Sequence, residues 1–253
     1  MKGKRGLIMG LANDRSLAWG IARALGSQGA ELAFSYQGEA LEKRVRPLAA
    51  ELGSDMLVDC DVSSMDALDA TFDEIAKKWD KLDFLVHAIG YSDKNELRGK
   101  FVDTSMDNFL MTMNISVYSF VAVAQRARKL MTNGGALLTL TYYGAEKVIP
   151  HYNVMGVAKS ALETSVKYLA ADLGPEGIRV NLVAAGPIRT TAAKSIPQFE
   201  RFEETWQDRA PLGWDVRDAE PAARACVALM SPWFPATTGE IVHVDGGFHA
   251  MGA

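Results

Sequence analysis

Two tyrosines and a lysine lie close enough in the chain to share a reaction. Tyr152 and Lys159 are seven residues apart, almost two turns of a helix, so a helix would present both side chains on one face. Tyr142 precedes Gly144 and Pro150, which interrupt a helix and place this tyrosine at a strand end or in a loop. An ammonium favours negative charge on a nearby phenol, so the elements that position these three residues decide whether they form a site or only a crowded surface.

The composition shows no preference for charged partners. The 253 residues are 48% hydrophobic and carry a formal net charge of -4. A mildly acidic chain without a basic cluster is not expected to bind nucleic acid or an anionic membrane. The amino-terminal apolar run is too short for a signal peptide and no stretch reaches membrane-spanning length, so we expect a cytoplasmic protein. Cys60 and Cys226 lie far apart without a metal-ligand pattern, and we expect reduced core cysteines and no metal site.

Short apolar runs alternate with amphipathic stretches along the whole chain. The apolar runs predict strands within residues 5–10, 30–36, 54–61, 81–90, 134–142, 177–186 and 239–247. The intervening stretches predict helices near residues 16–28, 39–52, 64–79, 106–131, 152–173 and 218–230. Continuous apolar strands separated by helices are typical of a parallel sheet covered on both faces. The prediction is an α/β fold: a single doubly wound, Rossmann-type domain over residues 1–253, with ligands beyond the carboxyl ends of seven parallel strands.

The turn after the first strand could bind a dinucleotide. The strand ends at Gly10 and a helix begins near Ser16 and Leu17, where free N–H groups and the helix dipole suit a pyrophosphate. The turn lacks the usual three-glycine pattern, because only Gly10 and Gly20 remain. Small residues at Ser16 and Ala18 still permit close approach, although an ordinary capped turn is an alternative.

Later strand ends add groups at the same edge of the sheet. Asp61 and Val62 follow the third strand, where an adenine ring would lie, although Asp61 could instead start the next helix with the two serines that follow. The fourth strand ends in HAIG, a small-residue platform that includes Ile89, and its single histidine, His87, is expected to be structural. The sixth strand runs into AAGPIRT, which could close on a nicotinamide amide or form an ordinary turn.

The residues after the second strand indicate which dinucleotide fits. An acid there would hold the ribose 2′-hydroxyl of NAD, and an arginine would accept the 2′-phosphate of NADP. Here the strand is followed by Gln37, Gly38 and Glu39, and the first bases, Lys43 and Arg44, come a turn later in the helix. Since Glu39 would repel a phosphate, the sequence favours NADH.

Together these features resemble the short-chain dehydrogenase/reductase family. The marks are Gly10 at the first turn, the Tyr152-x6-Lys159 spacing and the VDGG motif at residues 244–247. Ordinary members differ in the first turn, in having NNAG where this chain has HAIG, and in placing a serine near the position of Tyr142. The segments LTYYGAEKVIPHYNVMGVAKSALE and AAGPIRT resemble bacterial NADH-dependent enoyl-[acyl-carrier-protein] reductases of type II fatty acid synthesis, and the likeness extends from Lys4 to Gly247.

This resemblance implies a reaction and a role for each candidate residue. Hydride from NADH would attack the β-carbon of a trans-2-enoyl thioester on acyl carrier protein, and charge would build on the thioester oxygen. Tyr152 would donate a hydrogen bond to that oxygen, Lys159 would bind the nicotinamide ribose, and Tyr142 would shape the pocket. The implied substrate site comprises Ser92, Tyr142 and Tyr152. The implied NAD site comprises Gly10, Ser16, Leu17, Gln37, Asp61, Val62, Ile89, Lys159, Ile188, Arg189, Thr190, Thr191 and Ala192.

Other interpretations stay open at this point. A carbonyl reductase of the family, such as a 3-oxoacyl reductase, would need a hydroxyl near Tyr152, and Thr139 and Thr141 are close in the sequence. A dinucleotide-binding sensor without activity would need neither Tyr152 nor Lys159. Asn114 could match the relay asparagine of ordinary members or mark a kink in its helix.

The sequence also predicts a lid, and the resemblance implies an assembly. Residues 190–209 interrupt the strand–helix alternation, and their small residues could flex while the apolar ones cover a fatty chain. Pro197 would open a short helix there, and the residues expected on its solvent face are Glu200, Glu203 and Glu204. The alternative is a permanently ordered surface helix with Phe199 and Phe202 packed on the core. In this family the helices at residues 106–131 and 152–173 pair across subunits, which implies a homotetramer.

Overall fold

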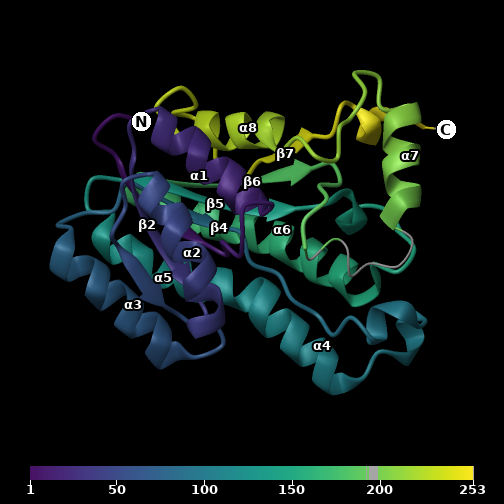
Figure 1. Cartoon of the computed structure of the whole chain (residues 1–253), viewed down its shortest axis with the longest axis horizontal. Coiled ribbons are helices and arrows are strands. Elements are labelled where there is room, and N and C mark those ends of the chain that lie inside the picture. Colours follow the sequence, from purple (N-terminus) through teal and green to yellow (C-terminus); the bar gives the residue numbers. More distant parts are fainter. Residues whose placement is uncertain (192, 194–198, 253) are drawn as a thin grey trace.

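A parallel sheet forms the centre of the molecule, whose computed structural model describes residues 1–191, 193 and 199–252. The seven strands lie in the order β3-β2-β1-β4-β5-β6-β7 (Figure 1). They are β1 (Arg5–Met9), β2 (Glu31–Tyr36), β3 (Leu57–Asp59), β4 (Phe84–His87), β5 (Gly135–Thr141), β6 (Ile178–Ala185) and β7 (Ile241–Val244). The strand order reverses between β1 and β4, the place where ligands bind in doubly wound sheets. The predicted α/β fold is confirmed.

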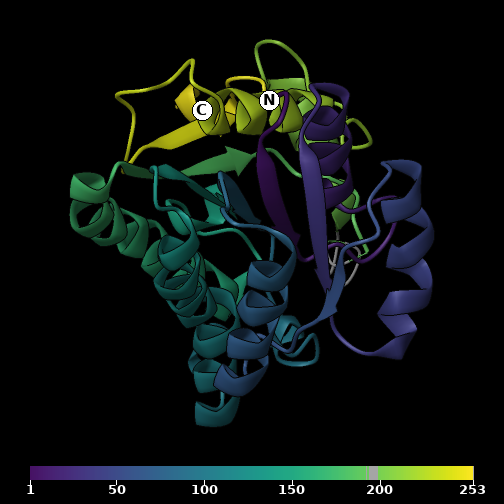
Figure 2. The same cartoon turned by 90° about the vertical axis from the view of Figure 1, so that its left-hand side faces the viewer.

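Helices cover both faces of this sheet (Figures 1 and 2). One layer contains α1 (Leu17–Ser27), α2 (Glu39–Glu51) and α8 (Glu220–Met230). The other contains α3 (Met65–Lys78), α5 (Ser119–Ala127) and α6 (Asn153–Leu173). In β1, Leu7 and Met9 belong to one core and Ile8 to the other, and all three are fully buried. Because both faces of the strands are covered, nearly every strand residue must be apolar, which is why the strands appear as continuous runs in the sequence.

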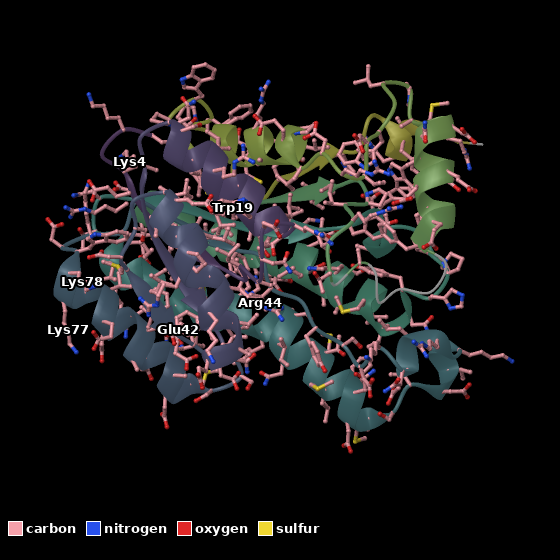
Figure 3. All side chains as sticks on the ribbon, viewed as in Figure 1. Lys4, Trp19, Glu42, Arg44, Lys77 and Lys78 are labelled. Carbon is pink, nitrogen blue, oxygen red and sulfur yellow. The ribbon has the colours of Figure 1, made fainter. Side chains whose placement is uncertain are left out.

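Several charged side chains of α2 and α3 point into solvent. Arg44 of α2 and the Lys77–Lys78 pair at the end of α3 are exposed (Figure 3). Trp19 of α1, in contrast, is turned toward the sheet and is almost completely buried. Among the described residues, no helix combines the length and apolar character needed to cross a bilayer.

The predicted helix at residues 106–131 is divided into pieces. α4 (Met106–Met113) passes into a π-helical turn (Asn114–Tyr118), then α5, and ends in a 3-10 turn (Arg128–Leu130). Such a π-turn widens the helix locally and is frequent at functional sites. Asn114 begins this turn, so it marks an irregularity in the helix, as one of its two interpretations expected.

Candidate active site

The loop after β1 must approach the end of β4 very closely. Gly10 has a φ of 93°, and a Cβ added there would lie 2.1 Å from the carbonyl oxygen of Ala88. A side chain is excluded on both grounds, since positive φ and close backbone approach each favour glycine. This one glycine therefore leaves the backbone free beside the amino end of α1, as the prediction of a dinucleotide site requires.

The first loop is tied to the segment that follows β6. Ser16 accepts hydrogen bonds from the N–H groups of Ala12, at 3.2 Å, and Asn13, at 3.1 Å, which fixes the loop before α1. The amide of Asn13 donates to the hydroxyl of Thr191 at 2.9 Å. Leu17 is the first residue of α1, so N–H groups at this helix end can face an anion. Two predicted cofactor-binding regions, 178 residues apart in sequence, thus lie side by side.

Two further predicted cofactor residues, Gln37 and Asp61, meet where β2 and β3 end. Asp61 accepts from the N–H and the hydroxyl of Ser63, at 2.9 and 2.7 Å, and these bonds lower the pKa of its carboxyl, with a smaller contribution from Gln37. The Asp61 side chain therefore shapes the start of the next helix, as its alternative interpretation expected. Val62 beside it is buried, and Gln37 is exposed. Its neighbour Glu39 pairs with Lys43 at 2.8 Å.

Lys159 lies deep in the carboxyl edge of the sheet. It is on α6, only 8% exposed, and its ammonium donates to the carbonyl of Leu140 at 2.8 Å. A Cβ added to Gly90, in the loop after β4 next to Ile89, would be 3.6 Å from Nζ. Burial lowers the pKa of Lys159 to about 8, and the charge of Glu163 opposes this shift. Two ammonium hydrogens remain for a ligand between α6 and the β4 loop.

Tyr152 is buried directly before α6. Its helix was predicted to include it, but α6 begins at Asn153, because His151 and Asn153 on either side have positive φ values of 64° and 42°. Such conformations are costly for residues other than glycine and concentrate at functional sites. The amide of Asn153 donates to the carbonyl of Gly99 at 2.9 Å and holds this bend. Tyr152 is 8% exposed, so its side chain lies inside the protein.

The phenols of Tyr142 and Tyr152 share one apolar environment. Their rings meet edge to face with centroids 5.2 Å apart. Burial raises the pKa of both phenols, and the charge of Glu163 raises that of Tyr152 further. Both groups therefore stay protonated at neutral pH and can donate hydrogen bonds. Tyr143 instead packs edge-on against Phe248.

An aromatic stack supports Tyr142 from its other side. Trp206 of α7 (Phe199–Arg209) is 1% exposed and stacks on Tyr142 at 5.9 Å and on Phe248 at 3.7 Å. The sequence reasoning missed Trp206, although its spacing from Phe199 and Phe202 puts all three near one helix face. α7 is thus packed on the rest of the site through Trp206.

The segment after β6 is held by its own contacts. The Arg189 N–H donates to the carbonyl of Val216 at 2.7 Å, and its guanidinium pairs with Glu203. The prediction that Glu203 lies on the solvent face of α7 is therefore wrong, because this carboxylate is partly buried against Arg189. Ile188 is buried, and the Thr190 hydroxyl accepts from the N–H of Ala193 at 3.0 Å. The other predicted residues of this region, Ala192, Ile196 and Pro197, lie outside the described residues.

Hydroxyl groups around the site are already engaged. Ser92 donates to Asn108 at 3.2 Å and accepts from Thr112 at 3.0 Å, which fastens the β4 loop to α4. Thr141 donates to Glu163 at 2.7 Å, and Thr139 donates to the His87 carbonyl at 3.0 Å. These two threonines were the candidates for the relay hydroxyl of a carbonyl reductase. Because both hydroxyls already donate hydrogen bonds within the protein, the carbonyl reductase alternative is weakened.

His87 has the structural role expected for it. Its ring is fully buried between Thr139, at 3.2 Å, and Ser119, at 2.8 Å. Burial and the nearby charge of Lys159 lower the pKa of His87 to about 3, so the ring is neutral. The two cysteines are buried and unpaired. Among the described residues, no group of three or more His, Cys, Asp and Glu side chains could hold a metal ion.

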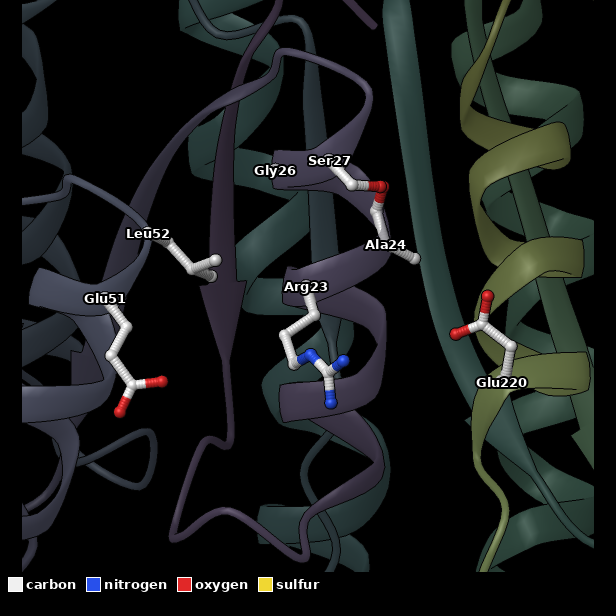
Figure 4. A pocket seen from close by; sticks show the side chains of 7 residues that line it. All are labelled: Arg23, Ala24, Gly26, Ser27, Glu51, Leu52 and Glu220. Carbon is white, nitrogen blue, oxygen red and sulfur yellow. The ribbon is translucent and has the colours of Figure 1, made fainter.

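A surface groove elsewhere on the molecule is separate from these residues. It runs along α1 between the end of α2 and α8, and Arg23 points between Glu51 and Glu220 (Figure 4). None of the predicted cofactor or substrate residues lines it. We therefore assign the chemistry to the carboxyl edge of the sheet.

A doubly wound parallel sheet with a buried Tyr–Lys pair at its carboxyl edge defines a fold of the short-chain dehydrogenase/reductase type. A family model described as enoyl-(acyl carrier protein) reductase matches residues 10–249, and the chain belongs to this family.

Proteins with this description are similar to the whole of this chain and to most of their own length. Enoyl-[acyl-carrier-protein] reductase [NADH] 1 of Rhizobium meliloti (strain 1021) is 57% identical over 253 residues, covering 100% of this chain and 92% of the relative. The crystal structure of the Anaplasma phagocytophilum reductase in complex with NAD has 53% identity and a TM-score of 0.95, covering 100% of this chain and 96% of that one. The Bacillus cereus reductase, solved with NADP+ and an indole naphthyridinone, has 47% identity and a TM-score of 0.96, covering 100% and 98%.

Proposed function

We propose that this chain is an NADH-dependent enoyl-[acyl-carrier-protein] reductase of type II fatty acid synthesis, which reduces the trans-2 double bond of an enoyl thioester. The observation that carries the proposal is that the phenol of Tyr152 and the ammonium of Lys159, seven residues apart at the start of α6, are both buried, with Lys159 held at the end of β5. Family membership and the NADH-dependent relatives support it.

Tyr152 is suited to stabilise the charge that develops in this reaction. When bound, NADH supplies the hydride that adds to the β-carbon of the enoyl group, and the thioester oxygen becomes an enolate oxygen. The phenol of Tyr152 is protonated at neutral pH, since burial raises its pKa above an already high ordinary value, so it can donate a hydrogen bond to that oxygen. A donor placed in advance in this way is worth roughly 3–4 kcal/mol. Tyr142 forms the wall next to this donor.

The NADH site follows from the edge of the sheet. Gly10 lets the backbone approach the pyrophosphate, and Lys159 can give its two remaining hydrogens to the hydroxyls of the nicotinamide ribose. Gly90 leaves room for the ribose beside Nζ. The remaining proposed contacts are Ser16, Leu17, Gln37, Asp61, Val62, Ile89, Ile188, Arg189, Thr190, Thr191 and Ala192, of which Arg189 would act through its backbone because its guanidinium is paired.

We also propose that residues 190–209 close the acyl site of a single domain that spans residues 1–253. The support is that α7 places Trp206 on Tyr142, and that Thr191 binds the first loop through Asn13. A segment in contact with both predicted binding regions can exclude water from the reacting atoms.

We propose a cytoplasmic homotetramer as the working form. Large apolar side chains are exposed on α4 and α6, the helices expected to pair across subunits. They include Met106, at 77% exposed, Leu110, at 58%, and Tyr168, at 72%. Isolated exposed residues are ordinary, but a group of them along two helices favours an interface.

A pair of substrates tests the proposed function. NADH oxidation is expected with a crotonyl thioester, which offers a C=C bond, and not with an acetoacetyl thioester, which offers a ketone. Preferred turnover of the acetoacetyl thioester would identify a carbonyl reductase. No turnover of either substrate would favour a sensor.

The structure predicts a preference for NADH over NADPH. With a crotonyl thioester, kcat/KM is expected to be at least about tenfold higher with NADH, which corresponds to about 1.4 kcal/mol. Gln37→Arg should reduce the ratio of kcat/KM with NADH to kcat/KM with NADPH about tenfold, because a guanidinium there can bind a 2′-phosphate. Gln28→Arg is the control, since Gln28 is exposed at the carboxyl end of α1, whereas the proposed pyrophosphate site lies at the amino end of this helix. A wild-type preference for NADPH would contradict the assignment of Gln37.

A further inference from the structure

A buried carboxylate lies one helical turn beyond Lys159. Glu163 is on α6, only 8% exposed, and it accepts a hydrogen bond from the hydroxyl of Thr141 at 2.7 Å. Buried acids are rare unless a partner compensates their charge, so the burial of Glu163 requires an explanation. Side chains four apart on a helix are neighbours, which brings Glu163 close to Lys159.

Two side chains of α6 hold Leu140 and Thr141, which are consecutive residues at the end of β5. Lys159 donates to the carbonyl of Leu140 at 2.8 Å, and Glu163 accepts from Thr141. Tyr142 follows immediately, and its ring meets Tyr152. The Lys159–Glu163 turn therefore fixes the point from which Tyr142 leaves the sheet.

We propose that Glu163 is a positioning residue of the reductase: its buried carboxylate keeps Lys159 as an ammonium that can bind the nicotinamide ribose and anchors Thr141 ahead of Tyr142. This inference rests on the proposed function, and it concerns a residue that need not contact NADH or the thioester.

The charges around the pair agree with this role. Burial lowers the pKa of Lys159 to about 8, and Glu163 is the charged group that opposes this shift. His87 faces Lys159 from β4 as a neutral ring. The charge of Glu163 also acts on Tyr152, which lies directly before α6. It raises the pKa of the phenol and so keeps the proton on this hydrogen-bond donor.

Glu163 itself has neighbours on three elements. Burial raises the pKa of its carboxyl, and the bond from Thr141 opposes this. Glu146, from the loop after β5, also raises it, while His243 of β7 and Lys167 of α6 lower it. The Thr141 bond is thus the strongest contact that favours the ionised carboxylate.

The test is the dissociation constant of NADH measured from pH 6 to pH 9.5. Lys159 binds ribose as an ammonium, so wild-type affinity should be full below pH 8 and fall as pH rises above it. In Glu163→Gln the charge that supports the ammonium is gone, so the fall should begin about one pH unit lower. At pH 8 this corresponds to about fivefold weaker binding, because the wild-type lysine is itself half deprotonated there. If Glu163 were only structural, its replacement would weaken NADH binding at every pH. It would not move the midpoint, the pH at which half of the pH-dependent affinity is lost.

Two further variants make the result decisive. Glu146→Gln removes a more exposed carboxylate, which pairs with His243 at 2.6 Å and raises the pKa of Glu163, so the midpoint should not move to lower pH. Thr141→Val keeps Glu163 but favours its neutral form, so the midpoint should move in the same direction as in Glu163→Gln. If Glu163→Gln does not fold, Thr141→Val decides.

The outcomes separate this inference from the proposed function. An active wild-type enzyme whose midpoint is the same in Glu163→Gln and Thr141→Val would overturn the role of Glu163 alone. A wild-type protein that neither binds NADH nor reduces crotonyl thioester would overturn the proposed function.

Discussion

Tyr152→Phe is expected to lower kcat for a crotonyl thioester by about 100- to 1,000-fold, the range for loss of one oxyanion donor. The phenylalanine ring can keep the packing on Tyr142, so only the hydrogen bond to the enolate oxygen is removed. NADH binding should be unchanged, because the phenol is assigned to the thioester. Initial rates of NADH oxidation and a fluorescence titration with NADH measure the two quantities.

Tyr143→Phe is the matched control for this prediction. It removes a phenol hydroxyl from the neighbouring residue, whose ring packs on Phe248 and Trp206. We expect close to wild-type turnover. A Tyr152→Phe enzyme that retains more than about a tenth of wild-type kcat would show that another group stabilises the enolate.

Lys159→Met is expected to weaken NADH binding at pH 7 by about 10- to 150-fold, since a hydrogen bond to a charged group contributes about 1.5–3 kcal/mol. Methionine fills the buried space of the lysine stem but supplies no donor to the ribose. The decline of NADH affinity above pH 8 should also disappear, because the group that titrates is gone. NADH titrations at several pH values measure both effects.

Lys147→Met controls for the loss of a positive charge, because Lys147 is exposed in the loop after β5. It should bind NADH as the wild type does. Equal losses of NADH affinity in Tyr152→Phe and Lys159→Met would contradict the separate roles given to the two residues.

The sheet and most helices could be predicted because their signals are local. Strands buried on both faces require continuous apolar runs, and β1 to β7 all fall inside predicted runs. β3 (Leu57–Asp59) is shorter than its run, which began at residue 54. The hydrophobic pattern could not show the π-turn at Asn114 or the left-handed residues beside Tyr152, because these depend on backbone geometry.

The parts of the site that sequence reasoning missed depend on contacts between distant segments. Glu203 has the spacing of a solvent-facing helix residue, but Arg189, from the segment after β6, covers it. Trp206 reaches Tyr142 only because α7 folds back over the loop after β5. The resemblance to a family supplied the roles of Tyr152 and Lys159, whereas the buried carboxylate of Glu163 became visible only with Thr141 placed against it.

The central claim is that the hydride reaches the β-carbon of an enoyl thioester, and isotope transfer tests it most directly. NADH carrying deuterium at the transferred position of C4 is incubated with the enzyme and a crotonyl thioester, and the product is examined by NMR. We expect a butyryl thioester with one deuterium at C3 and none at C2 when the solvent is ordinary water. A butyryl product with deuterium at C2, or a crotonyl thioester that remains unreduced while NADH is oxidised with a ketone substrate, would contradict it.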